Sequence, residues 1–180
     1  MKHFTALVLS ATAALLAAHS LPAQQHKAEL GTDIQVAYRR VSAGGQSASA
    51  TQIQLPAGVR GGFFLSPRTS IEVLLTLSYV NPSDDDAFTS MTLAMGPMIH
   101  LSMDETRTQG YVRPFVGVNY VNANERRSQL LFGGAAGIKV PAGRHAATRL
   151  EIFAFHAPDD EGFPTETRAG ANIGFSLFLP

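Results

Sequence analysis

The chain has 180 residues, as many basic as acidic side chains, and no cysteine. A net charge near zero gives no bulk attraction to nucleic acid, and the lack of cysteine excludes a disulfide framework and a lipid anchor on a cysteine. The chain is 16% charged and 45% hydrophobic. Such a composition does not by itself indicate the fold, so the order of apolar and polar residues along the chain has to be considered.

The N-terminal residues are typical of a secretory signal peptide. A basic start precedes a short apolar run, residues 7–18, and small residues follow it. This run is shorter than the roughly 20 apolar residues that a membrane-spanning helix needs. We predict a signal peptide over residues 1–23, with cleavage after Ala23 or, as second choice, after Ser20. The mature chain, residues 24–180, is then one domain, and a retained amphipathic or anchoring helix is the alternative.

Apolar and polar residues alternate with a period of two along the rest of the chain, which is typical of β-strands with one apolar face. The last segment shows this most clearly, because Ile173, Phe175 and Leu177 alternate with small or polar residues. Short connections rich in Gly, Pro, Ser and Asp separate the segments, so an antiparallel meander is the simplest topology. The predicted strands are residues 29–41, 50–64, 70–80, 88–101, 111–121, 129–140, 147–156 and 168–180.

Two of these strands contain an irregularity. Pro56 has no N–H to donate, so we expect it at a bulge or at an unpaired position. In the seventh segment the alternation puts Ile152 on the apolar face and sends Phe153 and Phe155 to the other face. A bulge after Glu151 would reverse this order, and both arrangements are compatible with the sequence.

The apolar faces are better interpreted as facing lipid than as facing a soluble core. The opposite faces are rich in Gly, Ala, Ser, Asn and Gln with isolated charges, whereas a soluble barrel covers its outer face densely with charge. Small polar side chains suit the narrow interior of a small membrane barrel. The sequence therefore predicts an all-β fold, an eight-stranded antiparallel up-and-down transmembrane β-barrel. A secreted soluble barrel around an apolar ligand is the alternative.

Three tyrosines, Tyr38, Tyr79 and Tyr120, recur at a spacing of 41 residues. Each ends the apolar face of an odd-numbered predicted strand. In an up-and-down barrel these ends lie at one level, so we predict an aromatic girdle, in which ring and hydroxyl lie between hydrocarbon and water.

The alternation also directs several charges to the inner faces. An unpaired charge in a narrow barrel is costly, so we predict a paired network that fills the lumen, with Glu72 and Glu151 as the natural anions. A gated path for ions and a pair of catalytic carboxylates are the alternatives. The predicted lumen network consists of Arg60, Glu72, Arg113, Lys139, Arg149, Glu151 and Arg168, with Asp33 and Arg39 as further inward charges.

In its pattern of strands the whole mature chain resembles the small eight-stranded outer-membrane β-barrels of Gram-negative bacteria, the OmpA/OmpX-like group (outer membrane protein beta-barrel domain), and its C-terminal end is the most specific part of this resemblance. Asn172, Gly174, Leu177 and Leu179 are similar to the C-terminal assembly signal of that family, which usually finishes on an aromatic residue, whereas Pro180 follows here.

The resemblance implies a porin-like monomer in the cell outer membrane, with both termini in the periplasm. Its expected partners are outer-membrane lipid, lipopolysaccharide and, during biogenesis, the barrel-assembly machinery; a nucleic acid is not among them. The outside loops would be residues 42–49, 81–86, 122–128 and 157–167.

His100 and Ser102 are similar to a His-x-Ser pair in a lipid A deacylase family of the outer membrane. The Asn that follows in that family is Met103 here, and the predicted topology puts the pair at the periplasmic end. We therefore predict no enzyme, no catalytic residues, no cofactor and no metal. The predicted function is a structural or interaction role for a barrel with a lumen filled by side chains. A narrow or gated channel is the alternative, followed by a lipid-modifying enzyme or a secreted ligand-binding barrel.

Overall fold

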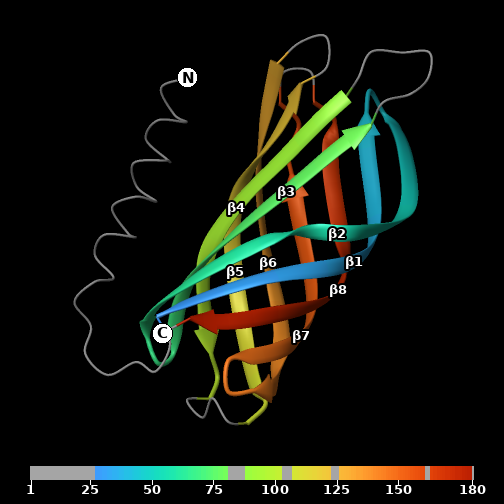
Figure 1. Ribbon diagram of the computed structural model, residues 1–180. Helices are drawn as coiled ribbons and strands as arrows, with labels where there is room; N and C mark the ends of the chain where they lie inside the picture. Colours follow the sequence, from blue (N-terminus) through green and yellow to red (C-terminus); the bar gives the residue numbers. More distant parts are fainter. Residues whose placement is uncertain (1–26, 81–87, 103–106, 123–125, 161–162, 180) are drawn as a thin grey trace.

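The computed structural model describes residues 27–80, 88–102, 107–122, 126–160 and 163–179, which form a closed antiparallel barrel. Each strand pairs with its neighbours in sequence, and β1 pairs with β8 (Figure 1). The predicted all-β up-and-down barrel is therefore confirmed. The described residues include no helix that is long and apolar enough to cross a membrane. The strands are β1 (Ala28–Ala43), β2 (Gln46–Ser66), β3 (Thr69–Val80), β4 (Phe88–His100), β5 (Gln109–Asn122), β6 (Arg126–Gly143), β7 (Ala146–Ala157) and β8 (Thr165–Leu179).

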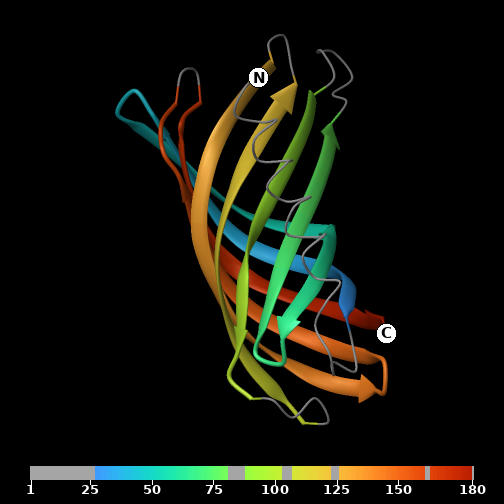
Figure 2. The ribbon, with the colours of Figure 1, turned by 90° about the vertical axis from the view of Figure 1, so that its left-hand side faces the viewer.

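The strands slope steeply around the barrel axis, as Figures 1 and 2 show. The shear of the barrel follows from the strand pairing. A path that starts at Tyr38 on β1 and steps from each residue to its paired residue, through β8 and around to β2, returns to β1 at Ala28. The shear is therefore ten residues. Eight strands with this shear tilt by roughly 40° and enclose an interior just wide enough for side chains. We call the end where β1 begins and β8 ends the terminal end, and the opposite end the far end.

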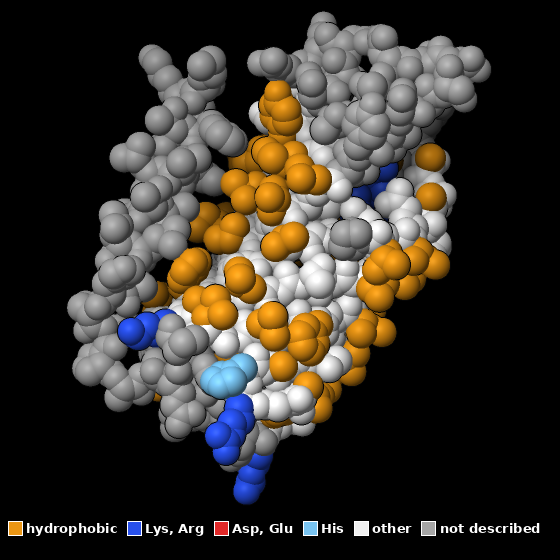
Figure 3. Space-filling model, viewed as in Figure 1, with side chains coloured by type: hydrophobic (Ala, Val, Ile, Leu, Met, Phe, Trp, Pro, Cys, Tyr) orange, Lys and Arg blue, Asp and Glu red, His pale blue; other side chains and the backbone are white. Residues whose placement is uncertain are grey.

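The barrel turns apolar side chains outward and charged side chains inward. Ile152 is 68% exposed and Leu130 is 62% exposed, whereas Lys139 is 2% exposed and Arg149 is 1% exposed. In Figure 3, apolar side chains cover much of the visible wall, and Lys and Arg lie toward its ends. This is the reverse of a soluble protein and is expected of a barrel whose wall faces hydrocarbon.

The first connection at the far end is shorter than predicted. β1 and β2 stay paired up to Ala43 and Gln46, which leaves only Gly44 and Gly45 to turn, with φ of 55° and 81°. The prediction of a loop over residues 42–49 was therefore wrong. The small residues there continue the ladder, and the two glycines supply the positive φ of a tight hairpin.

β2 contains a bulge around Pro56. Three residues, 55–57, lie opposite Ile34 alone, so the register between β1 and β2 shifts at this point. This agrees with the irregular position expected for a proline. The bulge also buries Ala57, which is 5% exposed. Unbroken alternation along the predicted strand 50–64 would have put Ala57 on the outer apolar face, which is wrong.

The far half of the barrel has a seam between β2 and β3. Their pairing ends at Val59 and Leu75, although both strands continue beyond these residues. From there on, β2 is paired with β1 and β3 with β4. At the start of the seam the Thr76 hydroxyl donates a hydrogen bond to the Ala57 carbonyl at 2.9 Å. In Figure 2 the β1–β2 hairpin lies at the upper left and the end of β3 at the upper right.

The alternation in β7 continues without a bulge. Ile152 faces outward, Phe153 is 8% exposed, and the rings of Phe153 and Phe155 stack in the lumen with centroids 6.5 Å apart. The alternative, in which a bulge after Glu151 reverses the faces, is therefore wrong.

Candidate functional site

Buried ion pairs fill the part of the lumen nearer the terminal end, and Arg60 is at their centre. From β2, its guanidinium donates to Asp33 on β1, to Glu72 on β3 at 2.7 Å and to Glu151 on β7 at 2.8 Å. All four side chains are 4% exposed or less. A single guanidinium thus connects four strands across the lumen.

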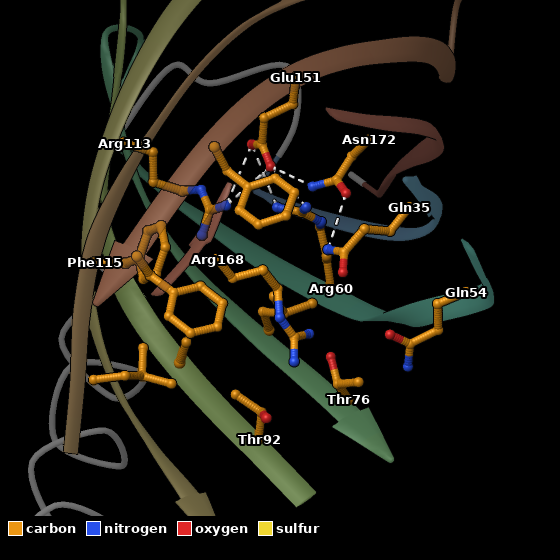
Figure 4. Close-up of a pocket in the computed structure, with 15 residues that line it drawn as sticks. Gln35, Gln54, Arg60, Thr76, Thr92, Arg113, Phe115, Glu151, Arg168 and Asn172 are labelled. Atoms are coloured by element: carbon orange, nitrogen blue, oxygen red, sulfur yellow. Dashed lines mark hydrogen bonds and ion pairs between the residues drawn. The ribbon is translucent and has the colours of Figure 1, made fainter. Parts of the chain in front are cut away.

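Glu151 is the most densely bonded carboxylate of the lumen. Besides Arg60, it accepts hydrogen bonds from Arg113 at 3.2 Å, from the Tyr111 hydroxyl at 3.0 Å and from the Asn172 amide at 2.9 Å. Figure 4 shows the side chains of Arg60, Arg113 and Asn172 directed at it. These donors come from β2, β5 and β8, so Glu151 holds together strands that are far apart in the sequence.

The remaining pairs make the group electrically neutral. Glu72 accepts from Arg149 and lies 3.0 Å from Nε of Arg113, and Lys139 pairs with Glu29 at the terminal end. Four carboxylates therefore face four cations, and in a narrow lumen such a balance avoids leaving a charge without a partner. We call the following residues the central network: Glu29, Asp33, Glu72, Glu151, Arg60, Arg113, Lys139 and Arg149.

Toward the far end the lumen widens into a polar cavity of about 480 Å³, which we call the far chamber. Arg39 and Arg168 line it and share the carboxylate of Glu166. Arg39 lies 2.8 Å from it, and Arg168 donates to it at 2.8 and 3.2 Å. Arg168 was predicted to belong to the same network as Glu72 and Glu151. The structure places it instead in a separate group with Glu166.

The sequence reading did not include two carboxylates that face the lumen. Glu166 fell in the predicted loop 157–167, but β8 begins at Thr165 and turns this side chain inward, where it is 6% exposed. Glu29 was not counted among the lumen charges, but it is 4% exposed and pairs with Lys139. Both follow from the alternation, because Glu29 near the start of β1 and Glu166 near the start of β8 lie on the same faces as the inward residues Asp33 and Arg168.

A layer of aromatic rings separates the far chamber from the central network. Phe115, Phe153 and Phe155 line a smaller cavity of about 50 Å³, which is bounded by Arg60 and Glu151 (Figure 4). The cavity volume therefore falls from about 480 Å³ in the far chamber to about 50 Å³ in the smaller cavity. Aromatic rings and ion pairs line the smaller one.

His100 lies near the terminal end of the lumen and is 2% exposed. Its Nε2 is 3.3 Å from the Ser70 hydroxyl, its ring stacks on Phe64 at 5.6 Å, and its Nδ1 has no hydrogen-bond partner. His100 and Ser102 are therefore not joined as a nucleophile and base would be. In the part of the chain that the structure describes, no group of three or more His, Asp or Glu could hold a metal ion.

The predicted girdle is described in part. Tyr38 is 52% exposed and Tyr120 is half-buried at the far ends of β1 and β5, and the side chain of Tyr79 lies outside the described part. The shear of the barrel brings the three backbone positions to nearly the same height. That they form a girdle at a membrane surface stays a prediction.

A glycine lies on the inner face of the C-terminal strand, and there is a steric reason for it. Gly174 faces the lumen beside Asp33, and a Cβ at this position would collide with the Asp33 carboxylate. Asn172 is also buried, whereas Leu177 and Leu179 face outward and are 47% and 42% exposed. That these residues act as an assembly signal stays a prediction.

Solved structures with a similar fold are small outer-membrane barrels. Neisserial surface protein A (NspA) matches with a TM-score of 0.60 and 10% identity over 84% of this chain and 97% of that one. This chain has the fold of the small outer-membrane β-barrels. The predicted resemblance is thus confirmed for the fold, and identity this low carries no more than that.

Two further matches are more distant. OprG of Pseudomonas aeruginosa matches with a TM-score of 0.49 and 11% identity over 89% of this chain and 99% of that one. Ail of Yersinia pestis matches with a TM-score of 0.44 and 11% identity over 84% of this chain and 99% of that one. No protein-family model and no curated protein matches the sequence.

Proposed function

We propose that this protein is an integral outer-membrane barrel with a structural or interaction role, not an enzyme, and that its central network closes the lumen. The observation that carries this proposal is the network itself. Its eight charged side chains are each 4% exposed or less and pair across the lumen. An eight-stranded barrel has an interior that its own side chains can fill, so such a network leaves no wide aqueous path.

Placement in the outer membrane rests on the apolar wall, on the fold and on the predicted signal peptide. Because the strand number is even, both ends of the barrel chain lie together, and in the proposed orientation they face the periplasm. The far end then faces outward, where lipid and lipopolysaccharide surround a monomeric barrel, and β8 is the strand that the assembly machinery reads.

Electrophoresis in SDS, with and without boiling, tests the membrane barrel on protein refolded into detergent micelles. A closed barrel resists SDS while unheated, so we expect two different apparent sizes. Identical mobility before and after boiling, together with solubility in plain buffer, would instead indicate a soluble barrel.

A narrow or gated channel is the second candidate, because the far chamber already forms half of a path. Planar-bilayer recording separates the two functions. We expect no unitary conductance from the wild type. A conductance that Glu72→Gln or Arg113→Ala changes, and that Arg40→Gln on the outer face leaves unchanged, would establish the channel instead.

A further inference from the structure

The seam and the far chamber meet at the same place in the barrel wall. Ile53, on the β2 side of the seam, is 76% exposed and also lines the chamber. Leu77, on the β3 side, is 64% exposed. Since β2 and β3 are unpaired here, no backbone ladder separates the chamber from the lipid-facing surface. The chamber therefore reaches the barrel wall at the seam, where exposed apolar side chains lie on both strands.

The seam lies within the apolar belt of the barrel. Ile53 pairs with Val36, which is the outward position directly below Tyr38 on β1. Leu77 is the outward position directly below Tyr79 on β3. Both edges of the seam are thus on the hydrocarbon side of the tyrosine positions, at a depth where acyl chains surround a membrane barrel.

The described residues that line the chamber carry a surplus of positive charge. Arg39 and Arg168 share the single carboxylate of Glu166, and Nε of Arg39 is buried without a hydrogen-bond partner. The side chains of the two arginines are 37% and 20% exposed, so a ligand in the chamber can reach both. The guanidinium of Arg168 also lies over the Phe155 ring at 5.3 Å, which fixes it at the chamber floor.

We infer that the far chamber binds a long-chain carboxylate, with its head group on Arg39 and Arg168 and its acyl chain leaving through the seam between Ile53 and Leu77. A carboxylate is favoured because Glu166 already shows that the two guanidiniums hold one, and the arginine fork matches its geometry. A cavity of about 480 Å³ is in the usual range for one small ligand. This inference rests on the proposed membrane location.

Tryptophan fluorescence tests the site directly, because the natural chain contains no tryptophan. Ile53→Trp places a single reporter at the seam, and stearic acid brominated in mid-chain is the quencher, added to refolded protein in detergent micelles. We expect saturable quenching. In the same reporter chain, Arg39→Gln with Arg168→Gln should raise the dissociation constant at least tenfold. The matched control is Arg40→Gln, the next residue on β1 with its side chain outside, which should leave it unchanged.

Two comparisons separate the site from simple partition into the micelle. The methyl ester of the same brominated acid has no charge and should quench without saturation. Hexanoate, which has the head group but a short chain, should compete at least tenfold more weakly than stearate. Equal quenching by acid and ester, or equal competition by hexanoate and stearate, would overturn the inference.

The state of the barrel is checked on each variant by the mobility shift on boiling. If the double variant Arg39→Gln with Arg168→Gln has a normal shift and an unchanged affinity, the inference is overturned and the proposed barrel stays intact. A wild type without a shift overturns the barrel itself. Should the double variant not fold, Arg39→Gln alone takes its place, because Arg39 is the more exposed of the two.

Discussion

Replacing Arg60 by methionine tests whether the lumen is closed and dry. The arginine pairs with Asp33, Glu72 and Glu151 and is 3% exposed. In the variant the two glutamates keep other cations, whereas the carboxylate of Asp33 loses its guanidinium and stays buried at 4% exposure. The loss of stability therefore comes mainly from one buried carboxylate that has lost its partner.

The expected magnitude follows from the burial of these pairs. Removing one partner of a buried ion pair costs about 3–5 kcal/mol, whereas an exposed pair contributes about 0–1 kcal/mol. We expect Arg60→Met to lower the free energy of unfolding by about 3–5 kcal/mol. With a urea dependence of about 1–3 kcal/mol per molar, the midpoint falls by about 1 M or more. Adding Asp33→Asn removes this unpaired buried charge and should restore about 1–3 kcal/mol of the free energy of unfolding.

Urea unfolding of the refolded protein in phospholipid vesicles, followed by circular dichroism, gives these values. Arg40→Met is the matched control, because Arg40 is exposed and bonds only weakly to Ser47, at 3.4 Å. If Arg60→Met and Arg40→Met had equal midpoints, water would have to screen the lumen charges. This result would contradict the closed lumen and favour the channel.

Three further substitutions test the wall, the last strand and the first hairpin. Ile152→Arg puts a charge in the middle of the lipid face of β7 and should cost about 2–4 kcal/mol in the same unfolding measurement, whereas arginine at the exposed hairpin residue Gln46 should cost almost nothing. Gly174→Val drives a side chain into Asp33 and should reduce the fraction of refolded protein that shifts on boiling. Gly45→Ala, at a φ of 81°, should destabilise the barrel by about 1–2 kcal/mol, and an unchanged midpoint would mean that the hairpin adopts another turn.

Much of the barrel can be predicted from the sequence because a strand in a small membrane barrel has two different surroundings. Lipid accepts only apolar side chains, and the lumen accepts small or paired ones. The alternate residues of each strand therefore indicate which face points to lipid and which to the lumen. This is why the inward positions of Arg60, Glu72, Arg113 and Glu151 follow from parity alone. Parity fails only locally, at the bulge, where Ala57 turns inward. It holds on both sides, because Leu55 and Val59 face outward as the alternation predicts.

The pairing between these charges cannot be predicted in the same way. Arg60 and Glu151 are 91 residues apart, and what brings them together is the shear of the barrel, which depends on the register of all eight strand pairs. The distance of Arg168 from Glu72 and Glu151 depends on the register in the same way, because its height on β8 places it in the far chamber. Its bond to Glu166, two residues away on the same face of β8, follows from the alternation. Alternation shows which face a residue is on, but not at which height it meets its partners.

The central network and the seam are parts of one arrangement. The ion pair between Arg60 and Glu72, at 2.7 Å, links β2 to β3 directly below Val59 and Leu75, the last paired residues of the two strands. Above this point the inner face of β2 carries neutral amides such as Gln54, and the lumen opens into the far chamber. Unpaired backbone groups in hydrocarbon cost several kcal/mol each, so strands can part only where other polar groups or water reach them. The far chamber brings polar side chains to the seam, and the layer of aromatic rings separates it from the central network. Arg60 therefore marks the boundary between a half of the barrel sealed by charge and a half whose wall can admit a ligand.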